Sequence, residues 1–86
     1  MKIERQPQAR AYFGIGRSMF YAQCKEGLIT RPIRLGTRAT GWPSDELIAI
    51  AAARVAGKQD DEIRALVCRL HAGRAEKGAH IVQLAE

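Results

Sequence analysis

Apolar residues recur at helical spacing near the start of this 86-residue chain. The pattern predicts two short helices, over residues 8–13 and 17–26, because their apolar side chains fall on one side and Gly14 and Gly27 follow them. Two helices joined by a short turn that contains glycine are typical of a helix-turn-helix.

The same spacing predicts two further helices in the second half of the chain. One is expected to run to about residue 56 from a cap at Ser44, and the next to about residue 72 from a cap at Asp60 or Asp61. The second of these has the clearest amphipathic pattern, with apolar residues at i, i+3, i+4 and i+7. These residues are Ile63, Leu66, Val67 and Leu70.

Between the second and third helices the spacing changes from helical to alternating. Residues 33–35 and 40–42 alternate apolar and polar side chains around a loop that contains Gly36, which predicts a β-hairpin. Trp42 ends the hairpin and is expected in the core. The predicted fold class is mainly α with a small β-hairpin, arranged as a winged helix-turn-helix in which the hairpin is the wing.

The elements divide the chain into three parts. Residues 1–7 are expected to be a flexible arm, residues 8–56 the winged helix-turn-helix, and residues 57–86 a C-terminal helix and tail. The C-terminal helix either packs on the same domain or forms a dimer contact. Self-association would use Ile63, Leu66, Val67 and Leu70. The tail after Gly73 has too few apolar residues to assign, namely Ile81, Val82 and Leu84.

Basic residues are concentrated in the first half of the chain. Residues 1–43 contain eight Lys or Arg against two Glu, a net charge of +6, whereas residues 44–86 contain six basic and seven acidic residues. All the aromatic side chains also lie in the first half. A basic, aromatic half indicates an anionic partner, and together with the fold it points to double-stranded DNA.

The candidate DNA-binding residues lie on the second helix and the hairpin. The polar face of that helix is opposite Phe20 and Cys24, which should turn inward. Tyr21 either contacts phosphate or covers the edge of the helix pair. The residues expected in the major groove are Arg17, Ser18, Met19 and Tyr21, with Lys25 on phosphate and Arg34 and Arg38 on the backbone or adjacent minor groove.

Other functions lack the residues that they would need. The two cysteines and two histidines do not have the spacing of a zinc site, and no nucleophile is paired with a base. We therefore expect no metal, no cofactor and no catalytic residue, and the protein is not expected to be an enzyme. The longest apolar stretch, residues 47–53, is too short to cross a membrane, and no signal peptide follows Met1, so a cytoplasmic protein is expected.

Four features stand in a characteristic order along residues 9–54: GIGRSMFY (14–21), RPIRLG (31–36), GW (41–42) and Arg54. In this order and spacing they resemble the AlpA-like phage and prophage regulators, a family related to excisionases and to the DNA-binding part of MerR-type regulators. The resemblance implies a winged helix-turn-helix that binds DNA as a transcription regulator or as a directionality factor for a prophage integrase.

Two residues depart from the family pattern. Gly16 stands where the family usually has Ser, so the hydroxyl that would cap the second helix is missing. Ile50 stands where many members have Trp, a change that should preserve a core contact.

Two alternatives to a transcription regulator stay open on the sequence. An excisionase-like recombination directionality factor would bind adjacent sites cooperatively, and either kind of DNA-binding protein would contact an integrase or RNA polymerase. A protein interaction module would grip its partner with the C-terminal amphipathic helix.

Overall fold

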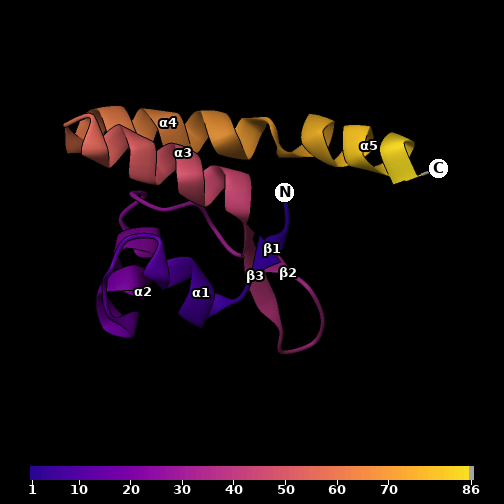
Figure 1. Cartoon of the computed structure of the whole chain (residues 1–86), viewed down its shortest axis with the longest axis horizontal. Coiled ribbons are helices and arrows are strands. Elements are labelled where there is room, and N and C mark those ends of the chain that lie inside the picture. Colours follow the sequence, from indigo (N-terminus) through magenta and orange to yellow (C-terminus); the bar gives the residue numbers. More distant parts are fainter. Residues whose placement is uncertain (86) are drawn as a thin grey trace.

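The structure is a computed structural model that describes the backbone of residues 1–85 and the side chains of residues 1–80. In this range the chain forms five helices and one small three-stranded antiparallel sheet (Figure 1). The helices are α1 (Gln6–Ala11), α2 (Arg17–Lys25), α3 (Ser44–Val55), α4 (Asp60–Ala72) and α5 (Arg74–Ala85). The strands are β1 (Ile3–Glu4), β2 (Ile33–Arg34) and β3 (Thr40–Pro43). The chain is therefore mainly helical with a small sheet, which confirms the coarse fold class.

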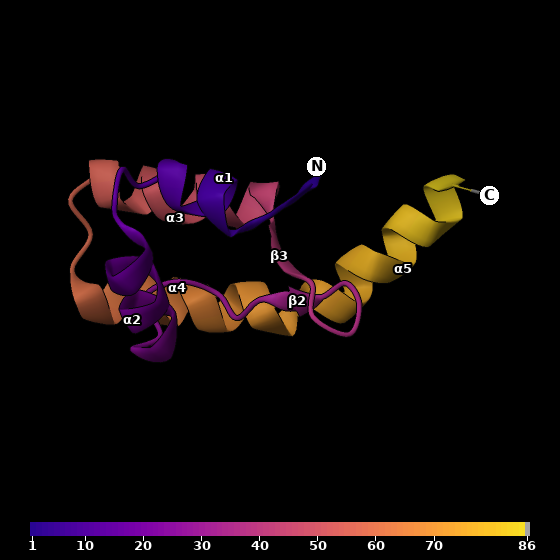
Figure 2. The same cartoon turned by 90° about the horizontal axis from the view of Figure 1, so that it is seen from below.

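The helices form two layers. In Figure 1, α3 and α4 lie along the top, and α1, α2 and the sheet lie below them. Both views show α5 continuing past the end of α4, away from α1 and α2 (Figure 2). The side of the molecule that carries α2 and the β2–β3 hairpin is thus opposite the α3–α4 layer.

The turn between α1 and α2 depends on a glycine. Gly14 has φ +63°, a left-handed conformation that other residues rarely adopt, and it lets the chain reverse after α1. Helix α2 then begins after Gly16, which supplies no side-chain cap, as the sequence indicated. It ends before Gly27, whose φ is +80°.

Two buried clusters form the core. The first joins α1, α2 and β3 to α3 and contains Ala9, Phe20, Ile29, Trp42 and Leu47. The second joins α3 to α4 and contains Leu28, Ile50, Ile63 and Val67. The burial of Trp42 and Ile50 is confirmed, and Ile63 and Val67 show α4 packing on the same domain. Val55, at the end of α3, is 90% exposed.

The expectation of a flexible arm over residues 1–7 is wrong. Ile3 pairs with Pro43 and Glu4 with Trp42, so β1 forms an edge of the sheet next to β3. Glu4 is buried and accepts a hydrogen bond of 2.7 Å from the Tyr12 hydroxyl. Pro7 does not interrupt the ordered structure. It lies in the first turn of α1, where the backbone N–H that proline lacks would have no helical partner.

Two predicted helix caps are also wrong. Ser44 is the first residue of α3 and Pro43 occupies the cap position; the Ser44 hydroxyl accepts a hydrogen bond of 3.0 Å from the Lys2 N–H instead of capping the helix. Gln59 rather than an aspartate precedes α4, and its N–H donates to the Glu62 carboxylate at 3.3 Å.

The tail that the sequence left unassigned contains α5. Its first residues are tied to α3 by ion pairs described below. The side chains of Ile81, Val82 and Leu84 lie outside the described residues. Over the part of the chain that the structure describes, no helix has both the length and the apolar character needed to cross a membrane.

Candidate nucleic-acid interface

The structure leaves every candidate residue on α2 accessible. These residues lie on the outer face of the helix, away from the buried Phe20. Met19 is 54% exposed and Tyr21 is 43% exposed. The exposed candidates on this helix are Arg17, Ser18, Met19, Tyr21 and Lys25.

Cys24 is only half-buried, and burial raises the pKa of its thiol to about 11, so it stays protonated at neutral pH.

Aromatic packing fixes the orientation of α2. The Phe20 ring meets Trp42 edge to face, with centroids 4.8 Å apart and an interplanar angle of 78°. Tyr21 lies 6.3 Å from Trp42 and 5.9 Å from Phe20. Tyr21 therefore covers the edge of the core with one part of its ring and exposes the rest, so the packing role is present and the phosphate contact stays a prediction.

Arg17 is positioned by this exposed ring. Its guanidinium carbon lies 5.8 Å from the centroid of Tyr21, within the range of a cation–π contact. Such a contact is weak at an exposed position and leaves all the guanidinium donors free to bind an acceptor. Arg17 is also the first residue of α2, where the positive end of the helix dipole adds to its charge.

The second basic element is the β2–β3 hairpin. Ile33 pairs with Gly41 and Arg34 with Thr40, and the loop closes through a hydrogen bond of 2.8 Å from the Leu35 N–H to the Ala39 carbonyl. Arg34 and Arg38 are exposed on the strand and in the loop. Neither forms an ion pair with any residue that the structure describes.

The two basic elements lie on the same side of the molecule but are not one cluster. In Figure 1, α2 and the hairpin both extend below the α3–α4 layer, with α1 and the sheet between them. The exposed cations of α2 and of the hairpin therefore form two separate groups.

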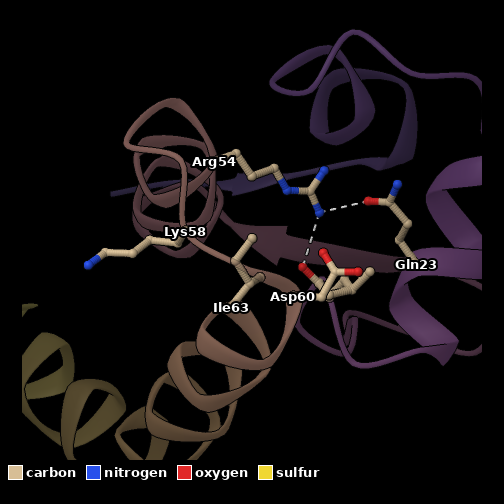
Figure 3. Close-up of a pocket in the computed structure, with 6 residues that line it drawn as sticks. Gln23, Arg54, Lys58, Asp60 and Ile63 are labelled. Carbon is tan, nitrogen blue, oxygen red and sulfur yellow. Dashed lines mark hydrogen bonds between the residues drawn. The ribbon is translucent and has the colours of Figure 1, made fainter.

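Arg54 of α3 binds to the C-terminal end of α2 and to the segment that follows it, a role that the sequence did not indicate. One of its terminal nitrogens donates to the Gln23 side-chain oxygen at 2.7 Å and to the Leu28 carbonyl at 3.2 Å (Figure 3). Its guanidinium carbon lies 4.6 Å from the ring centroid of Phe13. Burial lowers the pKa of Arg54, with Asp60 partly offsetting the effect. Arg54 thus joins α3 to the ends of both α1 and α2.

A pocket of about 210 Å³ lies beside Arg54 (Figure 3). It is lined by Gln23, Leu28, Arg54, Lys58, Asp60 and Ile63. Because Gln23 and Arg54 hydrogen-bond each other across it, these groups serve the packing of α2 on α3.

A buried carboxylate, also missed by the sequence, ties α5 to α3. The Glu46 side chain is fully buried and binds Arg74 through two hydrogen bonds of 2.7 and 2.9 Å. Lys77 lies 3.0 Å from Glu46 and 3.3 Å from Asp45. Burial alone would raise the pKa of Glu46, but the hydrogen bonds from Arg74 and Lys77 outweigh it and the pKa is lowered. The sequence placed Glu46 only in the first turn of a helix, since its partners lie about thirty residues away.

Comparison of the chain with known protein families, with curated proteins and with solved structures finds no match.

Proposed function

We propose that the protein binds double-stranded DNA in a sequence-specific manner, as a transcription regulator of the phage and prophage type. In this proposal α1, the turn at Gly14 and α2 form a helix-turn-helix, and the β2–β3 hairpin is its wing. The resemblance of residues 9–54 to AlpA-like regulators supports the same assignment.

One observation carries the proposal. Helix α2 and the β2–β3 hairpin lie on one side of the molecule, opposite the α3–α4 layer (Figure 1), and the Arg and Lys residues of both elements are exposed. Both elements are held by the same buried residue, because Trp42 packs against Phe20 of α2 and itself belongs to β3. A rigid joint between a basic helix and a basic hairpin suits a duplex, whose groove and flanking phosphates must be contacted together.

The residues have distinct roles in this complex. Helix α2 enters the major groove with its first turns, and Arg17 binds a guanine edge through two hydrogen bonds. Lys25, at the other end of α2, binds phosphate, and Arg34 and Arg38 follow the backbone or the adjacent minor groove. The further residues that line the groove are Ser18, Met19 and Tyr21.

The testing experiment measures binding to labelled duplex fragments from the region upstream of the gene and from any nearby attachment site. Titrations at two salt concentrations with random competitor DNA separate specific readout from simple charge attraction. Arg17→Ala is the informative variant, and Arg69→Ala is the matched control, because Arg69 is exposed on α4 and lies outside both basic elements. We expect one fragment to be retained against competitor, and this retention to be lost with Arg17→Ala alone.

Two other outcomes would redirect the proposal. If no fragment outcompetes random DNA at low salt, specific DNA binding is wrong and a protein interaction module becomes the better explanation. A cooperative footprint over several adjacent sites would instead favour a recombination directionality factor.

A further inference from the structure

The C-terminal helices hold both backbone polar groups of Arg31. The Arg31 N–H donates to Nε2 of His71 at 2.9 Å, and Nη2 of Arg74 donates to the Arg31 carbonyl at 2.6 Å. His71 lies in the last turn of α4, and Arg74 is the first residue of α5. A segment between α2 and the hairpin is thus fixed by residues about forty positions further along the chain.

Arg31 leads directly into the hairpin. Pro32 follows it, and β2 begins at Ile33. A proline restricts the residue before it to extended conformations and fixes its own φ, so little rotational freedom separates Arg31 from β2. Holding the backbone of Arg31 therefore sets where the hairpin begins and in which direction it runs.

Arg74 is itself held by the buried carboxylate of Glu46. The nitrogen that reaches the Arg31 carbonyl also donates to Glu46 at 2.7 Å, and Nε of Arg74 donates to the second carboxylate oxygen at 2.9 Å. This side chain therefore connects α3, α5 and the segment before the hairpin.

His71 can accept the Arg31 N–H at Nε2 only while its ring is neutral and carries its proton on Nδ1, the nitrogen that lies 3.3 Å from Nη1 of Arg31. A proton on Nε2 would place two N–H groups against each other and break the bond. The charged groups that face the ring are the guanidinium groups of Arg31 and Arg74 and the Glu46 carboxylate. Both Glu46 oxygens are already bound by Arg74 and Lys77, so the carboxylate offers a proton on His71 little compensation.

We propose that His71 and Arg74 are positioning residues for the DNA-binding hairpin: they fix it through the backbone of Arg31, and protonation of His71 releases it. The proposal rests on the proposed function, since it assigns the regulation of the same DNA-binding surface. Burial, followed by Arg31 and Arg74, lowers the pKa of His71 below its ordinary value of 6.5. The hairpin is therefore held at neutral pH and released in acid.

The experiment compares DNA affinity at about pH 7.5 and about pH 5.5 for the whole chain and three variants. His71→Gln keeps an acceptor that cannot be protonated, and His71→Phe removes the acceptor. His80→Gln is the matched control, because His80 is exposed on α5 and bonds to none of the described residues. Loss of one hydrogen bond predicts a fall of about five- to tenfold in the affinity of the unmodified chain in acid. We expect His71→Gln to abolish that fall, His71→Phe to bind weakly at both pH values, and His80→Gln to behave as the unmodified chain.

Amide hydrogen exchange on the free protein gives a second readout that does not need DNA. We expect His71→Phe to lose protection at the amides of residues 31 and 35, and His71→Gln to retain it. An acid-dependent loss of affinity in His71→Gln equal to that of the unmodified chain would overturn the proposal, as would full protection of residue 31 in His71→Phe. If no DNA fragment is bound specifically, the proposed function fails, while the exchange data still decide whether His71 holds the hairpin.

Discussion

The indole nitrogen of Trp42 donates a hydrogen bond of 2.8 Å to the carbonyl of Thr30, and both residues are fully buried. The bond joins β3 to the segment that follows α2. Since the Trp42 ring also packs edge to face on Phe20, one side chain sets the orientation of α2 relative to the hairpin.

Replacement of Trp42 by Phe should therefore destabilise the protein. Phe keeps an aromatic ring but leaves the buried Thr30 carbonyl without its donor and opens space in the core, so the free energy of unfolding should fall by about 2 to 4 kcal/mol. Urea denaturation measures this loss. Tyr21→Phe is the control, because it keeps the ring and removes only the hydroxyl of a side chain that is 43% exposed, which should change stability by less than about 0.5 kcal/mol. An equal loss in the free energy of unfolding for the two substitutions would contradict this role of Trp42.

The buried carboxylate of Glu46 should make stability fall in acid. Its pKa in the folded protein is below 4.5, the ordinary value that applies in the unfolded chain. As pH falls below 4.5 the unfolded chain takes up the proton first, so a contribution that is fully present above pH 4.5 is lost progressively below it. Urea unfolding over a pH series should show a smaller acid loss for Glu46→Gln than for the unmodified chain. Parallel curves for the two proteins below pH 4.5 would exclude this role for Glu46.

Arg17 and Arg38 should affect DNA binding in different ways. If Arg17 binds a guanine edge, Arg17→Ala should cost about 1 to 3 kcal/mol on the preferred fragment and relax the preference at one base pair. Arg38→Ala should weaken binding to all sequences alike and lower the salt dependence, because it removes a phosphate contact. Binding to a set of single-base variants of the preferred fragment measures both effects. A uniform loss across sequences for both substitutions would rule out base readout by Arg17.

Gly41 should tolerate no side chain. A Cβ at this position would clash with the Ile3 side chain and lie 3.0 Å from the Glu4 carbonyl oxygen, because β1 lies beside β3 in the sheet. Gly41→Ala should lower the free energy of unfolding by about 1 to 3 kcal/mol and loosen β1, which amide exchange at its residues detects. Gly16→Ala is the matched control, since nothing lies within 4 Å of a Cβ at Gly16. Stability that falls no more for Gly41→Ala than for this control would show that β1 can move aside.

The elements that sequence patterns predicted best are those whose signal is local. Helices α2, α3 and α4 have apolar spacing and end next to glycine or beside a change in pattern, and the alternation around Gly36 marks the hairpin. Strand β1 has two residues, too few to show any period, and it exists because its backbone pairs with β3 about forty residues later. The prediction of Ser44 as a helix cap failed for a related reason. Its hydroxyl bonds to Lys2, which lies far away in the sequence, and local patterns do not show such a contact.

The candidate site shows the same division. The exposed faces of α2 and the hairpin follow from helical and strand periodicity, so their accessibility was predictable residue by residue. The groups that hold these faces in position, Arg54 and the Glu46–Arg74 pair, are charged residues whose partners come from distant parts of the chain. Charged residues are usually exposed, so a sequence pattern predicts them at the surface. The spacing of Glu46, Arg54 and Arg74 along the chain does not show that their side chains become partly or fully buried.

The pairing of β1 with β3 constrains the order in which the protein can form during synthesis. Residues 3–4 leave the ribosome before residues 42–43, to which they bind, and α1, α2 and β2 are made in between. Closing so long a loop costs entropy that only the later contacts repay. Strand β1 therefore stays without its partner until β3 has emerged, and its pairing with β3 completes that edge of the sheet.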